Sequence, residues 1–478
     1  MILLALVLAG GILRFATLGT QSFWIDEAIA IHSARLDLSG LIDSLARTEG
    51  NPPLYFVLLD GWMRLFGDSE AAIRSLSALF GTATILVAYA IGRRLASSTR
   101  VGLAAAALAA FNPLLVWFSQ EARPYALLVL LAGLSFLLFA EALERPTARV
   151  LGGWALASGL ALATHYFAGI LIVPEALWLL HRVRPRRHAL LAVAGFSIVP
   201  LALIPLVADQ GQVQDYSFVK GEGLVSRVVA QVPKQMLVGY DAPYETAAVV
   251  LAGALTAVAV WLALTRAEGR ERRALALGAG AGLGAVALAA ALALAGADYF
   301  LSRYLLSVWL PLALVAAAGL GARRSGRLGV AVGAALCALF AFVVVSVAAR
   351  PELQRDDWRG IARALGPPAG GRAIIVSPIN GSIPLSLYLP GQRALGPSGA
   401  TVQEVDAVAV APHVAGEERR APVVPAATPP AGFREVARHR GRTYTVVRYR
   451  SDAPVLITPV MIGSLALLPG SPDYVLQN

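Results

Sequence analysis

Long apolar stretches, separated by short charged breaks, constrain the fold of this chain more than any other feature. A helix needs roughly 17 to 25 apolar residues to cross about 30 Å of hydrocarbon. By that length criterion we mark about eleven spans. They cover residues 1–18, 75–92, 101–118, 124–141, 150–164, 166–181, 189–207, 246–265, 274–296, 304–322 and 328–348. The sequence therefore predicts a mainly α, polytopic transmembrane helical bundle.

The amino-acid composition is typical of an integral membrane protein. Of the 478 residues, 57% are hydrophobic and 15% are charged, which departs strongly from an ordinary soluble domain. The net charge of +10 comes from arginines in short runs between apolar spans, so we expect no nucleic-acid partner. The single cysteine, Cys337, lies within an apolar run and forms no intrachain disulfide.

The arginines predict the orientation of the chain. Short loops rich in arginine stay in the cytoplasm, and arginines occupy alternate breaks, near residues 93–100, 145–149, 182–187, 266–273 and 323–327. The N-terminus is then cytoplasmic, with the first span retained as a helix. The segments expected outside are 19–74, 119–123, 208–245, 297–303 and the chain from about Arg350. The Ala- and Arg-rich composition fits a bacterial cytoplasmic (inner) membrane.

Two extracytoplasmic parts are expected to have structure of their own. In the loop 19–74, Ala28 to Arg47 predicts one amphipathic helix and Leu54 to Phe66 another, both along the membrane interface. Residues 349–478 are richer in Pro, Gly and charge, and predict a small mixed α/β domain beyond a transmembrane domain of residues 1–348. There we expect a helix up to Leu365 and short strands at 373–376, 407–410, 433–438 and 444–449.

An adjacent carboxylate pair, Asp26 and Glu27, follows the first apolar span almost directly. Unpaired carboxylates are costly in hydrocarbon, so both side chains are expected at the outer membrane surface. Because acidic residues are also favoured in the first turn of a helix, a structural role remains an alternative, and it suits Glu27 better than Asp26.

Three motifs carry a resemblance to a known group: Trp24-Ile25-Asp26-Glu27-Ala28, Asn51-Pro52-Pro53-Leu54-Tyr55, and Ser119-Gln120-Glu121-Ala122-Arg123-Pro124-Tyr125. With them the chain resembles the GT-C membrane glycosyltransferases, in the branch of the protein O-mannosyltransferases and aminoarabinose transferase. The resemblance implies a polyprenyl-phosphate sugar donor, a hydroxyl acceptor and inversion at the anomeric carbon. It also implies an acidic catalytic residue at the position of Asp26. The residues 1–348 would form the GT-C-like catalytic domain.

The chemistry asks for the same residue types. Displacing a lipid phosphate from an anomeric carbon needs a base on the acceptor hydroxyl, and we expect Asp26 to be that base. Glu27 is a second catalytic candidate; it could instead orient an arginine or hold a metal. The departing phosphate needs cationic donors, for which Arg123 and Arg303, with Tyr125, are the candidates. Snorkelling to the headgroups is the alternative for both arginines.

Further substrate contacts are expected from side chains at the outer ends of the spans, namely Asn51, Glu121, His165, Tyr166 and Tyr304. Any membrane interface displays such His and Tyr residues, so a structural role is the alternative. The outer loop 208–245, with the two rare lysines Lys220 and Lys234, could cover the donor. A carboxylate pair without a nearby histidine is a weak metal signal, so no metal or other cofactor is predicted, although a divalent ion is possible.

These observations favour an inverting glycosyltransferase acting on the outer face of the membrane, on a protein, lipid or polysaccharide hydroxyl. A transporter or lipid flippase for cell-envelope precursors is the alternative, but it would place ionisable groups near the bilayer midplane, whereas here they gather at the outer ends. A noncatalytic envelope scaffold also remains open.

Overall fold

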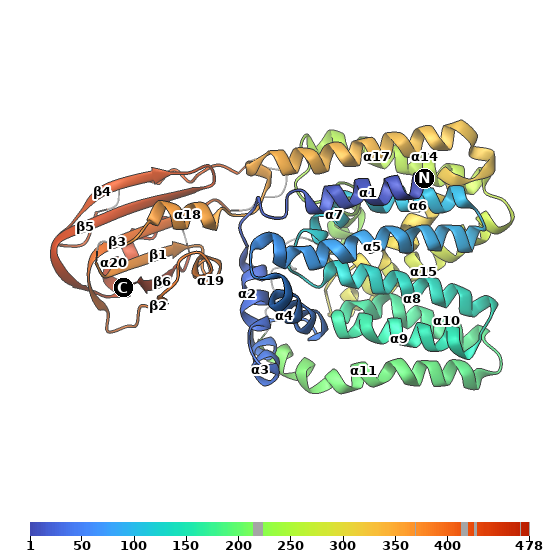
Figure 1. Cartoon of the computed structure of the whole chain (residues 1–478), viewed down its shortest axis with the longest axis horizontal. Coiled ribbons are helices and arrows are strands. Elements are labelled where there is room, and N and C mark those ends of the chain that lie inside the picture. Colours follow the sequence, from blue (N-terminus) through green and yellow to red (C-terminus); the bar gives the residue numbers. More distant parts are fainter. Residues whose placement is uncertain (214–222, 369, 413–418, 425–427, 469, 478) are drawn as a thin grey trace. The chain divides into compact units, whose positions relative to one another are not determined.

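The computed structural model describes the chain except for residues 214–222, 369, 413–418, 425–427, 469 and 478 (Figure 1). By its internal contacts the chain forms two compact units. Unit 1 comprises Met1–Leu18 and Ser33–Ser346, and unit 2 comprises Gly19–His32 and Val347–Asn478. The short segment that carries Asp26 and Glu27 is thus grouped with the C-terminal residues, which the sequence did not indicate.

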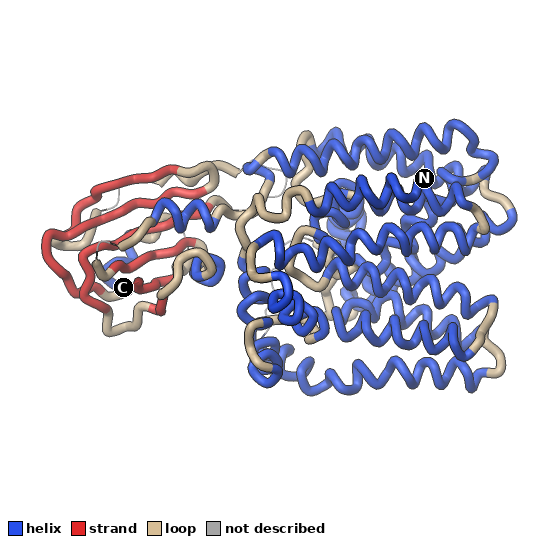
Figure 2. Tube along the Cα trace, in the orientation of Figure 1, coloured by secondary structure: helices blue, strands red, loops and turns tan. Residues whose placement is uncertain are grey.

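Every expected apolar span coincides with a helix, which confirms the predicted fold class. These helices are α1 (Ile2–Phe15), α5 (Glu70–Ala96), α6 (Thr99–Phe111) with α7 (Pro113–Ser119), α8 (Tyr125–Glu144), α9 (Ala148–Thr164), α10 (Gly169–Arg182), α11 (Arg186–Val213), α14 (Glu245–Arg266), α15 (Gly269–Leu294), α16 (Trp309–Gly321) and α17 (Gly326–Ala349). In Figure 2 helices make up unit 1 and the strands belong to unit 2.

Fewer helices pass a strict length test than the sequence predicted. Within the described residues, six are long and apolar enough to cross a bilayer, or seven if the bent pair α6 and α7 is one span. Helices α1 and α16 are apolar but have only 14 and 13 residues. The expected tenth span loses its beginning because residues before Trp309 form turns and a short 3-10 helix, η4 (Leu306–Val308).

The bend of 59° between α6 and α7 is stabilised by a buried arginine. Pro113 has no N–H to donate to the carbonyl of Ala109, and Arg14 of α1 supplies the missing donors. Its guanidinium donates to the carbonyls of Ala109 and Ala110, each at 2.9 Å, and to Ser119 Oγ at 3.1 Å. The carbonyls that the helix break leaves without N–H donors therefore pair with the buried guanidinium of Arg14.

Two amides fix the segment that follows this bend. Asn112 Oδ1 accepts from the backbone N–H of Leu115 and so caps α7, while its Nδ2 donates to Met236 O at 2.9 Å. Gln120 donates to Leu13 O at 2.9 Å and to Thr17 Oγ1 at 2.8 Å, at the C-terminal end of α1. Helix α7 is consequently held at its start by α13 (Val232–Val238) and just beyond its end by α1.

Close helix contacts and one buried acid account for much of the remaining packing. A Cβ atom on Gly319 of α16 would lie 1.9 Å from Ala259 O of α14, so this crossing requires glycine. Glu175 of α10 is buried and accepts hydrogen bonds from Ser135 Oγ at 2.6 Å and Trp154 Nε1 at 2.9 Å. This acid joins α10 to α8 and α9.

The arginine-rich loops meet at one end of unit 1. Arg94 pairs with Glu141 at 2.6 Å and Arg273 with Glu144 at 2.9 Å. These ion pairs link the loops after α5 and α8 with the loop before α15. The sequence analysis placed these segments on the cytoplasmic side, and that orientation stays a prediction.

The helices of the first long loop differ from the prediction in one respect. The expected single helix from Ala28 to Arg47 is two helices, α2 (Ile25–Ala34) and α3 (Leu38–Thr48). Asp37 begins the second one, because its side chain accepts from Gly40 N at 2.9 Å and gives α3 an N-cap. The other expected helix is α4 (Leu54–Phe66), with the predicted bounds.

Unit 2 is built on a six-stranded mixed sheet in the order β2-β6-β1-β3-β5-β4. Strands β1 and β3 are parallel and all other neighbours are antiparallel. The strands are β1 (Arg372–Ser377), β2 (Gln392–Ala394), β3 (Ala400–Val410), β4 (Phe433–Arg440), β5 (Tyr444–Ile457) and β6 (Asp473–Gln477). The predicted α/β character and four of these strands are confirmed, whereas β2 and β6 were not predicted.

Both faces of this sheet are covered. On β1, Ile374 and Val376 face a cluster with Trp358 of α18 (Trp358–Leu365), and Ile375 faces the opposite cluster with Ile462. A strand buried on both faces reads as a continuous apolar run, which is why residues 373–376 stood out in the sequence. The short elements of the two units are η1 (Tyr166–Ala168), α12 (Leu224–Ser226), the π-helix η3 (Arg227–Gln231), η5 (Arg323–Ser325), η6 (Pro351–Leu353), α19 (Ser382–Ser386), α20 (Pro459–Ile462) and η7 (Gly463–Leu465).

Candidate active site

The carboxylate pair opens helix α2 in unit 2. Glu27 is buried in the third position of the helix, and its Oε2 accepts from the backbone N–H of Trp24 at 3.4 Å. An acid there satisfies an N–H that the first turn leaves without an intrahelical partner. Asp26 is half-buried one residue earlier. The two acids therefore differ: Glu27 holds the start of the helix, and Asp26 is the one with exposed surface.

The C-terminal domain holds the segment in front of these acids. Phe23 N donates to the hydroxyl of Tyr388 at 2.7 Å, and the two rings stack with centroids 6.3 Å apart. Ser22 Oγ donates to Asp356 O at 2.7 Å, and the guanidinium of Arg355 lies 5.9 Å from the Trp24 ring centroid. Residues far apart in the chain thus fix the entry to α2.

In unit 1, Arg123 lies in the loop before α8 and pairs with an acid that the sequence did not single out. Both nitrogens of its guanidinium fork bond the carboxylate of Glu49, with NH2 to Oε2 at 3.0 Å. Asn51 Nδ2 donates to the same Oε2 at 3.1 Å. All three side chains are buried. The Glu49–Arg123–Asn51 cluster connects two of the motifs that carried the resemblance.

An aromatic group surrounds His165, the residue that ends α9. The His165 ring lies 5.6 Å from that of Tyr125 and 6.0 Å from that of Tyr304, between ring centroids. The guanidinium of Arg303 lies 5.1 Å from the centroid of Tyr304. Arg303 and Tyr304 precede α16 as part of a turn, and do not begin the span as expected.

The electrostatics of His165 show that this region is positive. Burial, followed by the charges of Arg123 and Arg303, lowers the pKa of His165 to about 3, so the imidazole is neutral near pH 7. Its Nδ1 accepts from Phe167 N at 3.3 Å, which leaves the proton on Nε2. No hydrogen-bond acceptor for Nε2 exists among the described residues. His165 thus presents a buried N–H donor.

Other predicted residues lie around this group. Tyr166 donates to Gln210 Oε1 at 2.9 Å, and Gln210 of α11 in turn donates to Asn51 O at 3.2 Å. Tyr166 therefore supports the Glu49–Arg123–Asn51 cluster through Gln210. Glu121 is buried. The pKa of Tyr240 is raised to about 12, mainly because Tyr240 itself is buried and in part because of the negative charge of Glu121. The Tyr240 hydroxyl and Ser302 Oγ are 3.1 Å apart.

An apolar cavity of about 350 Å³ adjoins the turn that carries Arg303. Phe300 and Leu305, on either side of Arg303 in the chain, both line it, together with Trp309 and Phe340. Arg227 borders the turn, donating to Asp298 Oδ1 at 2.8 Å and to Phe300 O at 3.1 Å. The turn that carries Arg303 therefore also contributes two residues, Phe300 and Leu305, to an apolar cavity.

Two further expectations concern the outer loop and a metal. Lys234 pairs with Glu245 at 2.7 Å, at the start of α14, and Lys220 lies outside the described residues. Among the residues that the structure describes, no group of three or more His, Cys, Asp or Glu side chains could hold a metal ion.

Comparison with known proteins gives a family match and a fold match. Residues 50–208 match the family model described as dolichyl-phosphate-mannose-protein mannosyltransferase. ArnT from Cupriavidus metallidurans, in its crystal structure bound to undecaprenyl phosphate, aligns over 93% of this chain and 97% of its own, with 14% identity and a TM-score of 0.56. The chain shares the fold of this ArnT structure. No curated protein matches the sequence significantly.

Two other solved structures are less similar. The apo state of the same ArnT shares 17% identity over 66% of this chain, with a TM-score of 0.48. Archaeal AglB from Archaeoglobus fulgidus, in complex with an inhibitory peptide and a dolichol-phosphate, shares 13% over 76% with a TM-score of 0.47. The chain covers only 59% and 57% of these two structures.

The GT-C fold and the family match confirm the predicted resemblance to the GT-C membrane glycosyltransferases, and with them a multi-pass membrane protein. The matched residues include the Asn51 and Arg123 motifs and His165, but do not include Asp26 or any part of unit 2.

The sequence analysis did not identify Glu49 or Tyr240. Glu49 stands two residues before Asn51, a position that could have suggested it.

Proposed function

We propose that this protein is an inverting glycosyltransferase that moves a sugar from a polyprenyl-phosphate donor to a hydroxyl acceptor on the outer face of a bacterial cytoplasmic membrane. The observation that carries the proposal is that Arg123 and Arg303 both act on the buried His165 N–H donor, and that Phe300 and Leu305, in the turn that carries Arg303, line an apolar cavity. A phosphate on an isoprenoid chain needs both environments at once. The undecaprenyl phosphate bound by ArnT, a structure with the same fold, supports this donor class.

In the proposed reaction, Asp26 accepts the proton of the acceptor hydroxyl, whose oxygen attacks the anomeric carbon. The bond from that carbon to the phosphate oxygen breaks, and the lipid phosphate leaves with the negative charge. Arg123 and Arg303 bind the phosphate oxygens, aided by the hydroxyl of Tyr125 and by His165 Nε2–H, where charge increases in the transition state. Arg123, Tyr125 and His165 are buried and Arg303 is half-buried, so water screens these donors less than it would on the surface.

The remaining predicted residues have supporting roles in this proposal. Glu27 positions Asp26 by capping α2. Asn51 acts on Arg123 through Glu49, and Tyr166 supports Asn51 through Gln210. Glu121 and Tyr304 border the sugar. The donor sugar is left open, and the acceptor is a protein, lipid or polysaccharide hydroxyl.

The test is sugar transfer by the purified protein in lipid from a panel of radiolabelled polyprenyl-phosphate sugars, with Asp26→Asn beside the wild type. We expect the variant to fold normally and to lose about 10²- to 10⁴-fold in kcat, the usual contribution of a general base. Asp43→Asn, an exposed acid of α3, is the matched control and should be fully active.

The alternatives make different predictions for the same samples. A scaffold would bind no donor lipid and would be indifferent to Asp26→Asn. A flippase would move the donor lipid across the bilayer without releasing polyprenyl phosphate. If the wild type is inert with every donor yet binds the lipid through Arg123 and Arg303, the acceptor is missing and the panel of acceptors is widened.

A further inference from the structure

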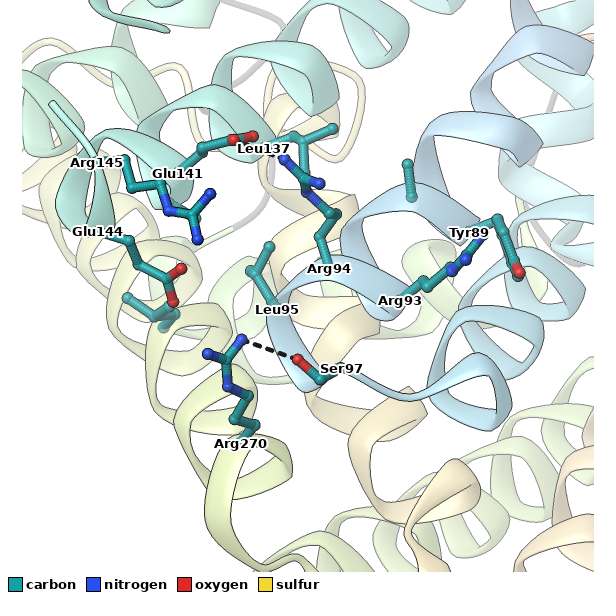
Figure 3. Close-up of a pocket in the computed structure, with 13 residues that line it drawn as sticks. Tyr89, Arg93, Arg94, Leu95, Ser97, Leu137, Glu141, Glu144, Arg145 and Arg270 are labelled. Atoms are coloured by element: carbon teal, nitrogen blue, oxygen red, sulfur yellow. Dashed lines mark hydrogen bonds and ion pairs between the residues drawn. The ribbon is translucent and has the colours of Figure 1, made fainter. Parts of the chain in front are cut away.

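A second cavity, of about 560 Å³, lies at the arginine-rich end of unit 1, where the loops after α5 and α8 meet the start of α15. It is unrelated to the candidate active site, since none of its lining residues belongs to that group. Figure 3 shows the side chains of Arg94, Arg145 and Arg270 around a common space, each from a different helix end. Arg93 also lines it.

The cavity has surplus positive charge. Four arginines line it against two acids, Glu141 and Glu144. Both acids are already paired, Glu141 with Arg94 at 2.6 Å and Glu144 with Arg273 at 2.9 Å. Among the described residues, Arg93, Arg145 and Arg270 have no carboxylate within ion-pair distance, and all three are exposed, so they are available to an anion from outside the chain.

The contacts that Arg93 and Arg270 make are with uncharged groups, which leaves their guanidinium groups available to an anion. Arg270 donates to Ser97 Oγ at 2.9 Å, and Arg93 lies 5.9 Å from the ring centroid of Tyr89. The exposed Arg145 has neither a hydrogen bond nor an ion pair from its side chain within the described part of the chain. A topology signal needs arginines in these loops, but it does not require three helices to enclose a cavity with them.

Three leucines, Leu95, Leu137 and Leu277, line the cavity together with the arginines. Cationic side chains beside aliphatic ones match a molecule that is anionic at one end and apolar at the other. Basic pockets between transmembrane helices bind lipid headgroups. A free inorganic phosphate would use the arginines and leave the leucines without a contact.

We propose that this cavity binds the phosphate headgroup of an anionic phospholipid, with Arg145 and Arg270 on the phosphate oxygens and the glycerol and first acyl carbons over Leu137 and Leu277. The bound lipid bridges the ends of α5, α8 and α15 and so stabilises unit 1 from the end opposite the candidate active site. Binding at this cavity does not depend on the proposed transfer reaction.

The test measures lipid retention by the full-length protein. Wild type and the double variant Arg145→Gln/Arg270→Gln are purified into nanodiscs of phosphatidylcholine with or without phosphatidylglycerol, and their melting temperatures and co-purified lipids are compared. Arg149→Gln is the matched control, because Arg149 is an exposed arginine four residues from Arg145 that does not line the cavity.

We expect phosphatidylglycerol to raise the melting temperature of the wild type and of Arg149→Gln, and to be retained at least about tenfold less by the double variant, since each arginine near a lipid phosphate adds appreciably to binding. Equal retention by the double variant overturns the proposal. So does equal stabilisation of the detergent-solubilised wild type by inorganic phosphate alone. Should the double variant fail to fold, Arg145→Gln alone serves, because its side chain makes no described contact to lose.

Discussion

The Glu49–Arg123 ion pair is the least replaceable contact of the candidate site. Removing one partner leaves a buried charge uncompensated, which typically costs about 3–5 kcal/mol. We therefore expect Glu49→Gln to lower the stability of the folded protein by about that amount and to weaken donor binding, measured by reversible unfolding in mixed micelles and by donor-lipid titration.

An exposed pair provides the control for this prediction. Arg64 and Asp60, one helical turn apart on α4, are 2.9 Å from each other, and Arg64 is largely exposed. Exposed pairs contribute about 0–1 kcal/mol, so Asp60→Asn should be almost silent. Equal effects of the two substitutions would mean that Arg123 needs no partner.

His165 predicts how stability depends on pH. Its pKa is about 3 in the folded protein and about 6.5 when unfolded, so between these values the unfolded chain binds a proton that the folded protein does not. Stability contributed by the neutral imidazole is complete above about pH 6.5 and is lost as the pH falls toward 3. His165→Asn keeps an acceptor for Phe167 N and removes the titration.

The measurement is the pH dependence of the unfolding free energy of wild type and His165→Asn. The wild type should take up about one more proton than the variant on unfolding between pH 4 and 6. Parallel curves for the two proteins would show that His165 is not buried in the neutral form.

Single residues were predictable from the sequence only where a motif pointed to them. Arg123 and His165 stood at span ends and lie in one positive region, but their partner Glu49 came from another loop, and no pattern in the sequence pairs residues 74 positions apart. Residues 304–308 were assigned to the tenth span because apolar residues continue through them, whereas α16 begins only at Trp309. Hydropathy records composition, and it does not detect where a helix begins.

Helix α2 is the element on which the candidate chemistry depends, and Tyr388 supports it. Tyr388→Phe removes the acceptor for Phe23 N, and leaving such a backbone N–H without a partner costs about 1–3 kcal/mol. We expect kcat to fall about tenfold while donor affinity stays unchanged, because misplacing a catalytic group slows the reaction and the donor contacts lie in unit 1. Steady-state kinetics with a separate donor-binding assay will measure both.

Tyr444→Phe is the control within the same domain, since the one hydrogen-bond partner of its hydroxyl among the described residues is His439 Nε2, at 3.5 Å. If Tyr388→Phe weakens donor binding as much as it lowers kcat, the residue acts through general stability and does not position α2.

Elements with a strong periodic pattern were predictable, and those set by a single cap or by long-range pairing were not. The bundle helices and α4 follow from apolar length and from the prolines before Leu54. The break between α2 and α3 depends on the Asp37 cap, a local hydrogen bond inside an otherwise amphipathic pattern. Strand β6 pairs with β1 from far along the chain, with Leu476 opposite Ala373, and β2 pairs with β6 in turn. Both strands therefore depend on long-range pairing, which no local pattern predicts.

At the scale of the whole molecule, the arginine distribution predicts orientation. With Cys337→Ala as background, a cysteine at the exposed position Ser398 should react with a membrane-impermeant maleimide in intact cells, whereas one at the exposed position Arg149 should react only after lysis. The opposite labelling pattern would invert the topology and place the carboxylate pair in the cytoplasm.

Unit 2 is assembled from the two ends of the chain, and this has a consequence during synthesis. Gly19–His32 leaves the ribosome before most of the bundle helices, yet the residues that hold it, Asp356 and Tyr388, are translated after the whole bundle. The helices can insert one after another while the acidic segment waits. If the proposed roles hold, we expect a chain released before residue 347 to bind donor lipid but to transfer no sugar, because the residues that hold the segment of Asp26 have not yet been made.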